Sequence, residues 1–179
     1  MDCVVVEAEQ FGRVLFSAEK SLFRLEMQSA YDAPGEFSAV ERFINGDPQH
    51  PDTDPDSVAW RSQVQSWVSA GITVDRVRIH NDIPTNYQQW QRWAARWNID
   101  AGETIRYIKI SDAFSCGLMP KAGIDDWWII DEKNILRMKF DDEYRLTHCL
   151  LETSGEAIKE ACKWRDLAIS NSHPDEGTK

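Results

Sequence analysis

The stretch from residue 72 to residue 110 constrains the fold more than any other part of the sequence. ITVDRVRIH, at 72–80, is rich in β-branched residues and alternates in polarity, which predicts a strand. NYQQWQRWAARWN, at 86–98, has a helical pattern, and TIRYIKI, at 104–110, predicts a second strand after Ala101-Gly102. A strand, a helix and a strand in this order are typical of a right-handed crossover between parallel strands. We therefore predict an α/β domain.

The rest of the chain adds strands and helices to this unit. Alternating or apolar runs predict strands at 21–28, 127–131, 135–140 and 148–152, and helices are expected at 36–45, 58–70 and 154–170. GDPQHPDTDPDS, at 46–57, has no apolar residue and is expected to be a solvated loop. We predict one domain over residues 1–170 with a single mixed sheet of about five to seven strands flanked by helices. An α+β arrangement is the alternative, and residues 171–179 are expected to form a flexible tail.

The helix at 86–98 carries an aromatic stripe. The stripe covers about a third of the helical wheel and consists of Tyr87, Trp90, Trp93, Ala94 and Trp97. Each aromatic ring buries ~150–250 Å², so the stripe is expected to lie on the sheet as one wall of the core. The alternative is that one end, at Tyr87 or Trp90, lies partly exposed beside a cleft.

Composition and charge exclude several classes of protein. The formal net charge is −10, which argues against direct binding to the phosphates of nucleic acids. No window reaches ~18 uninterrupted apolar residues, and the N-terminal segment lacks a basic region, so neither a membrane span nor a signal peptide is expected. The four cysteines are scattered without zinc-site spacing. We expect a cytoplasmic protein without a metal or cofactor.

Charged residues gather on the predicted strands and near their carboxyl ends, where ligands bind in open α/β sheets. One interpretation is that three arginines, Arg76, Arg78 and Arg106, together bind a carboxylate or phosphate. The alternative is that these arginines pair with acidic neighbours such as Glu103 in an ion network. A histidine paired with an aspartate, such as Asp126, is conceivable for acid–base work, but no Ser-His-Asp spacing, P-loop or HExxH motif is present. The candidate ligand-binding residues are Arg24, Glu26, Arg76, Arg78, His80, Tyr87, Trp90, Arg106 and Asp131.

Several phrases occur in an order that resembles a known family. They are FRLEMQSAYDAPGE, VDRVRIHNDIPTNYQQW, NIDAGETIRYI, DDWWIIDEKNILRMKFDDE and KWRDLAIS. Together they resemble an uncharacterised actinobacterial family of domains of unknown function, over residues from about 11 to 170. Members of that family are often encoded beside XRE-type helix-turn-helix regulators of the WhiJ kind. The resemblance implies a helix-turn-helix protein as a partner.

The arrangement of R-V-R-I, Y-x-x-W, A-G-E-x-I-R and W-I-I-D also looks like a phospholipase D-type half-domain. The catalytic form of that domain needs H-x-K-x4-D, with the histidine as the nucleophile. Counted back from Asp131, Asp126 stands at the lysine position and Ile124 at the histidine position. This resemblance therefore implies a phospholipase D-like fold without the phosphodiesterase chemistry.

Two hypotheses about function follow. The first is a non-catalytic binding or regulatory module that recognises a small molecule or a protein partner, such as a helix-turn-helix regulator. The second is an enzyme of a specialised-metabolite pathway that acts on a small polar or anionic substrate. A well-formed pocket with a strongly perturbed Asp or His pKa favours the enzyme, whereas an exposed apolar patch favours a protein partner. The oligomeric state does not follow from the sequence.

Overall fold

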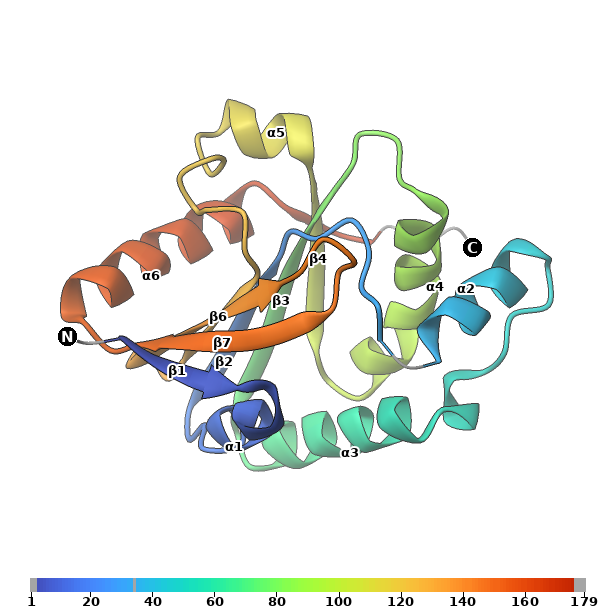
Figure 1. The fold of residues 1–179 in the computed structure, drawn as a ribbon, viewed down its shortest axis with the longest axis horizontal. Coiled ribbons are helices and arrows are strands. Elements are labelled where there is room, and N and C mark those ends of the chain that lie inside the picture. The colour runs from blue at the N-terminus through green and yellow to red at the C-terminus, as the bar shows by residue number, and fades with distance from the viewer. Residues whose placement is uncertain (1–2, 34, 176–179) are drawn as a thin grey trace.

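The computed structural model describes residues 3–33 and 35–175. Within them the chain forms one mixed sheet in the order β1-β7-β6-β5-β2-β3-β4-β8 (Figure 1). Its strands are β1 Cys3–Glu7, β2 Ser21–Glu26, β3 Thr73–His80, β4 Thr104–Lys109, β5 Trp127–Ile130, β6 Asn134–Phe140, β7 Leu146–Glu152 and β8 His173–Pro174. The α/β class and the single mixed sheet are confirmed, although these eight strands exceed the predicted number.

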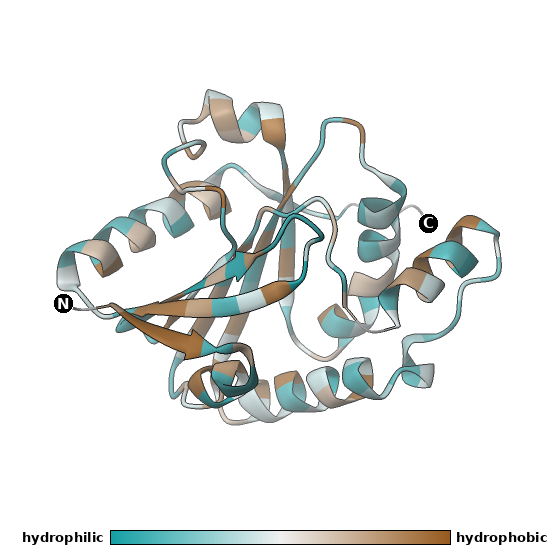
Figure 2. Ribbon diagram, in the orientation of Figure 1, coloured by the Kyte–Doolittle hydropathy of each residue, from teal (hydrophilic) through white to brown (hydrophobic). Residues whose placement is uncertain are grey.

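Helices cover both faces of the sheet (Figure 1). Their bounds are α1 Phe11–Leu15, α2 Glu36–Ile44, α3 Pro55–Ser69, α4 Asn86–Asp100, α5 Ile110–Ser115 and α6 Gly155–Ser170, with short 3-10 helices at Ala8–Gln10 and Pro51–Thr53. The helices α1, α3 and α4 cover one face, with α2 packed against α4, whereas α5 and α6 cover the other face. Figure 2 shows that hydrophobic residues are concentrated in the strands between these layers.

The central strands β2, β3 and β4 are parallel. The helix α4 connects β3 to β4, so the predicted strand–helix–strand unit is confirmed. It begins with a capping box, in which the Thr85 side chain accepts from the backbone of Gln88 and the Gln88 side chain accepts from the backbone of Thr85. The chain leaves α4 through Gly102 at φ 107, where an added Cβ would lie 3.0 Å from the Val68 side chain.

The strands β5, β6, β7 and β1 form an antiparallel half that joins the parallel half through β2. Because β5 runs antiparallel to β2, the residue before β5, Asp126, lies at the carboxyl end of β2. The residue after β5, Asp131, lies at the opposite edge, beside Ser21. The expectation that Asp131 belongs with the carboxyl ends of the parallel strands is therefore wrong.

The alternation of each strand divides the core in two. Leu22 and Val74 point toward α1 and α3, whereas Phe23 and Val77 point toward α5 and α6. Four charged residues belong to the first face, because they share the parity of Leu22 and Val74. They are Arg24 and Glu26 of β2 and Arg76 and Arg78 of β3. These four charged residues thus lie between the sheet and the helical layer that contains α4.

The prediction for the buried side of α4 is wrong. The helix buries Gln88, Gln91 and Ala95 against the sheet, while Trp90 and Trp93 are half-buried. Ala95 packs with Ile105 and Tyr107 of β4. The aromatic stripe lies on another side of α4, which does not face the sheet. There Trp93 contacts Phe43 of α2 with ring centroids 5.7 Å apart. The stripe joins α4 to α2 rather than to the sheet.

The C-terminal segment also differs from the expectation of a flexible tail over 171–179. Ser172 is buried, and His173–Pro174 forms the edge strand β8 on β4. Residues 176–179 lie outside the described residues. None of the helices in the described parts of the chain is both long and apolar enough to span a membrane.

Candidate functional site

A cavity of about 570 Å³ lies over the carboxyl-terminal halves of β2 and β3. Its floor includes Arg24 and Glu26 of β2 and Arg76 and Arg78 of β3. Its walls come from α2, α3, α4 and the segments around them, including the polar loop at 46–57. The cavity therefore lies on one face of the sheet, toward the carboxyl ends of the parallel strands, near which open α/β sheets bind their ligands.

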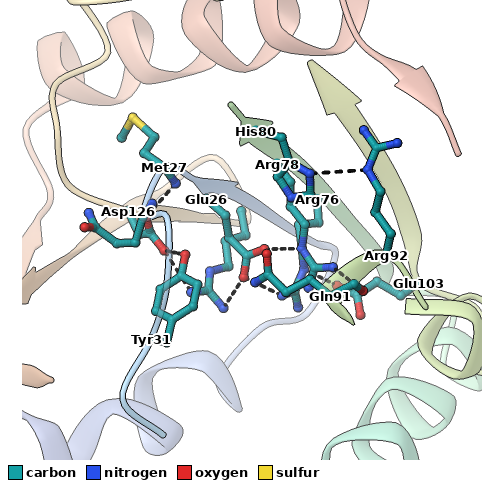
Figure 3. Close-up of polar contacts among 12 residues, drawn as sticks. Glu26, Met27, Tyr31, Arg76, Arg78, His80, Gln91, Arg92, Glu103 and Asp126 are labelled. Carbon is teal, nitrogen blue, oxygen red and sulfur yellow. Dashed lines mark hydrogen bonds and ion pairs between the residues drawn. The ribbon is translucent and has the colours of Figure 1, made fainter. Parts of the chain in front are cut away.

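Glu26 is the centre of the cavity floor. Its carboxylate binds Arg76 at 2.7 Å and Arg24 at 3.0 Å, and it also accepts a hydrogen bond from Arg78 Nε (Figure 3). The strand register explains this arrangement, because Arg24 lies opposite Arg76 and Glu26 lies opposite Arg78. Burial alone would raise the pKa of Glu26, but the three guanidinium groups outweigh it and hold the pKa well below its usual range.

Two further carboxylates, which do not line the cavity, bind the arginines of its floor. Glu103, just before β4, accepts from Arg76 Nε at 2.6 Å. Asp126 is fully buried and accepts from Arg24 at 2.9 Å, from the Tyr31 hydroxyl at 2.5 Å and from the backbone N–H of Met27 at 2.7 Å (Figure 3). Burial raises the pKa of Asp126, although the positive charge of Arg24 opposes the rise. Each arginine of the floor is thus bound to at least one carboxylate.

Aromatic rings enclose the same arginines. The Arg24 guanidinium lies 5.6 Å from the centre of the Tyr31 ring and 5.4 Å from that of Trp128. Arg76 lies 5.8 Å from the Trp60 ring and 5.9 Å from the Trp128 ring. Among the described residues, Arg24 Nε and Trp128 Nε1 are buried without a hydrogen-bond acceptor, and both side chains line the cavity.

A second aromatic group forms the wall between α2 and α4. The Tyr31 and Tyr87 rings lie 6.1 Å apart, and Tyr87 and Trp90 lie 5.5 Å apart. The Tyr87 hydroxyl donates to Glu36 at 2.5 Å, at the first residue of α2. Burial raises the pKa of Glu36, and burial and the neighbouring Glu36 charge raise the pKa of Tyr87 far above its usual range.

The structure brings six of the nine candidate residues together around this cavity. They are Arg24, Glu26, Arg76, Arg78, Tyr87 and Trp90. The expected clamp of three arginines is wrong, because Arg106 pairs with Val77 in the register and so points to the other face of the sheet. There Arg106 donates to Ser172. The alternative, an ion network with Glu26 and Glu103, describes Arg76 and Arg78 correctly.

The remaining two candidates have structural surroundings. His80 is buried beyond the cavity, where its Nδ1 accepts from Arg92 at 3.3 Å and its ring packs on Tyr107 at 5.1 Å. Burial and the charges of Arg78 and Arg92 lower the pKa of His80 to about 3, so the imidazole stays neutral. Asp131 accepts from the backbone N–H groups of residues 19–21 and shapes the turn before β2.

Most residues that line the cavity were not singled out as ligand candidates from the sequence, and four of these contribute contacts described above. They are Tyr31, Glu36, Trp60 and Trp128. For Trp128 the strand pattern offers a signal, because its position in β5 places it opposite Arg24. Tyr31 and Glu36 lie in and after an irregular loop, where no period reveals the direction of a side chain. In the described residues, no three His, Cys, Asp or Glu side chains are grouped in a way that would hold a metal ion.

Comparisons with known proteins place the fold. A family model described as "Domain of unknown function (DUF6879)" matches residues 9–176. No curated protein matches the chain. Nuc, a phospholipase D family member from Salmonella typhimurium, is similar in structure with a TM-score of 0.54 at 11% identity, and the match covers 98% of both chains. NucT from Helicobacter pylori gives a TM-score of 0.51 at 14% identity over 96% of both chains. The phospholipase D-like fold is therefore confirmed.

An archaeal chromatin protein, TrmBL2, has a similar fold with a TM-score of 0.54 at 11% identity. The match covers 97% of this chain but 55% of the archaeal protein, so this chain spans about half of that protein's length.

Proposed function

The chain belongs to the DUF6879 family of domains of unknown function, and on that premise we propose that it is a non-catalytic binding and regulatory module. It takes a small molecule into the cavity over β2 and β3. The observation that carries this proposal is a formed cavity of about 570 Å³ whose charged floor is already neutralised by its own ion pairs. This volume falls within the ~300–1,000 Å³ range of small-molecule sites.

The chemistry of the floor supports binding rather than turnover. A general acid or base works best with a pKa near the operating pH and within reach of the substrate. Glu26 has a strongly lowered pKa and is bound to three arginines, and the neutral His80 lies outside the cavity. Asp126 stands where the lysine of the phospholipase D motif would be, and Ile124, at the histidine position, is exposed. The chain thus lacks the imidazole that this fold uses as a nucleophile.

The ligand has an aromatic or apolar part and at least one polar group. Nine aromatic side chains line the cavity and offer flat apolar surfaces, namely Phe11, Tyr31, Trp60, Tyr87, Trp90, Trp93, Trp128, Phe140 and Tyr144. Arg24, Glu26, Arg76 and Arg78 on the floor offer hydrogen-bonding groups to the polar part of the ligand.

We further propose that the module acts through a separate DNA-binding protein of the helix-turn-helix type. The archaeal chromatin protein with a similar fold binds DNA. This chain has a net charge of −10, which opposes direct contact with phosphates, so a partner would make that contact. The helix α2, which borders the cavity, exposes Phe37 and Ile44, and an exposed apolar surface of this kind suits a protein partner.

An enzyme remains the second candidate because of one observation. Glu36 lines the cavity, and burial raises its pKa toward the range in which a carboxyl group transfers protons. Its substrate would be a small polar molecule held among the same aromatic rings.

Affinity selection with mass spectrometry separates these candidates. The protein is incubated with the small-molecule fraction of a bacterial extract, separated from unbound compounds and denatured to release what it holds. We expect a compound that leaves with its mass unchanged and that is lost when Trp90 is replaced by Ala. The matched control is Trp164→Ala on α6, on the opposite side of the sheet. A released compound of altered mass would support the enzyme, and equal retention by both variants would refute the cavity as the site.

A further inference from the structure

Glu36 differs from the carboxylates that bind the arginines of the cavity floor. Glu26, Glu103 and Asp126 each bind an arginine at hydrogen-bond distance. Glu36 lines the same cavity and is only partly exposed, yet in the part of the chain that the structure describes it forms no ion pair. Its hydrogen bond comes from the Tyr87 hydroxyl at 2.5 Å, which carries no positive charge. A largely buried carboxylate without a cation is costly, and a bound cation would remove that cost.

The nearest charged groups do not supply this cation. Arg24 and Arg78 act on Glu36 through their charges, but both are bonded to Glu26, whose negative charge opposes theirs at Glu36. The arginines are fixed in the floor by the strand register, and α2 places Glu36 in the wall. Among the described residues, the two arginines that act on this carboxylate are therefore already paired with another one.

A group of aromatic rings extends from the tyrosine that binds this carboxylate. The Tyr87 ring lies 6.1 Å from Tyr31 and 5.5 Å from Trp90, and all three rings line the cavity together with Glu36. Faces of tyrosine and tryptophan rings attract cations, and they do so best when the cation is weakly hydrated. Methylated ammonium groups meet this condition, because their methyl groups shed water easily and pack against aromatic faces.

We propose that Tyr31, Tyr87, Trp90 and Glu36 form a binding site for the quaternary ammonium group of a small organic cation. This inference rests on the proposed function of the cavity and names the class of its ligand. Glu36 supplies the negative charge, and the three rings supply the apolar, electron-rich surface.

Calorimetric titration with two molecules of the same shape tests the proposal. Choline carries a trimethylammonium group, and 3,3-dimethylbutan-1-ol replaces it with an uncharged tert-butyl group. We expect the full chain to bind choline roughly tenfold or more tightly than the neutral alcohol, as a cation–aromatic contact and an ion pair together provide. Equal affinities, or no detectable binding of choline at millimolar concentrations, would overturn the assignment.

Two variants locate the effect. Glu36→Gln keeps the size of the side chain and an acceptor for Tyr87, and it is expected to weaken choline binding roughly tenfold without changing the affinity for the alcohol. Glu41→Gln removes the same charge from α2 at an exposed position outside the cavity lining, and it is expected to leave both affinities unchanged. Circular dichroism confirms that each variant is folded. Unchanged choline binding in Glu36→Gln, or an equal loss in Glu41→Gln, would overturn the site.

The outcome is distinguishable from that of the proposed function. If affinity selection releases an anionic or neutral compound and choline does not bind, the cavity is still a ligand site but the ammonium assignment is wrong. If no compound is retained while choline binds through Glu36, the ammonium site stands.

Discussion

At the scale of single residues, two glutamates in one cavity have opposite effects on the folded state. Glu26 is held by three guanidinium groups, which lower its pKa, so its charge stabilises the fold. Glu36 has no cation in the described chain and a raised pKa, so its charge opposes folding. The difference comes from position alone, because β2 places Glu26 among the arginines and α2 places Glu36 away from them.

We therefore predict that Glu26→Gln destabilises the protein by about 3–5 kcal/mol at pH 7, because it leaves buried guanidinium charge unpaired. Glu36→Gln should leave the free energy of unfolding within about 0.5 kcal/mol of the wild type or raise it. Urea unfolding followed by tryptophan fluorescence measures both. Similar losses in the two variants would show that the floor is not the neutralised network described above.

The same measurement at low pH adds a second check. A lowered pKa means that the stability contributed by Glu26 is present above its unfolded value of 4.5 and is lost as the pH falls below that value. The difference between the wild type and Glu26→Gln should therefore shrink when the pH is lowered from 7 to about 3.5. A difference that grows on acidification would contradict the ion network.

At the scale of elements, α4 shows how buried charge changes the orientation of a helix. A helical wheel favours the tryptophan side as the buried side, because those residues are large and apolar. Arg78 of β3 instead requires a polar partner, and the backbone carbonyl of Gln91 accepts from it. The Gln88 side chain accepts from the backbone N–H groups of Asn81 and Thr85. Satisfying these buried groups outweighs burying indole rings that also find partners on α2.

Two adjacent alanines test this orientation. Ala95 is buried against Ile105 and Tyr107, whereas Ala94 lines the cavity. Ala95→Leu should lower the free energy of unfolding by about 1–3 kcal/mol through overcrowding. Ala94→Leu has the same change of helix propensity and should have an effect below about 1 kcal/mol, because the added carbons enter open space. Thermal unfolding shows which of the two variants is less stable. A greater loss of stability in Ala94→Leu than in Ala95→Leu would support the orientation expected from the sequence, with the aromatic stripe on the sheet.

The sequence predicts elements better than it predicts the contacts between them. The β-branched run at 72–80 and the period of α4 are local signals, and both elements form where expected. The pairing of β5 with β2 joins segments that are far apart in the sequence. The residues around Asp126 and Asp131 therefore do not indicate that Asp126 lies beside the site and Asp131 at the opposite end of the strand. Of the six candidates that line the cavity, the four on β2 and β3 follow from strand alternation, and Tyr87 and Trp90 follow from the helical period of α4. Tyr31 and Glu36 lie outside regular strands.

At the scale of the whole molecule, the two faces of the sheet have different roles. The face toward α5 and α6 packs apolar residues, including Trp127 and Trp164. The face toward α2, α3 and α4 contains the charged floor and the cavity. The chain thus has a phospholipase D-like fold with a cavity over β2 and β3.

The central claim, that this cavity binds a small molecule, is tested most directly by NMR of the indole N–H groups in protein labelled with ¹⁵N-tryptophan. The eight tryptophans give one signal each, and Trp60, Trp90, Trp93 and Trp128 line the cavity. On addition of the compound recovered by affinity selection, we predict that these four signals shift while those of Trp127 and Trp164, on the opposite face, do not. Shifts confined to Trp127 and Trp164, or no shifts at saturating compound, would contradict the claim.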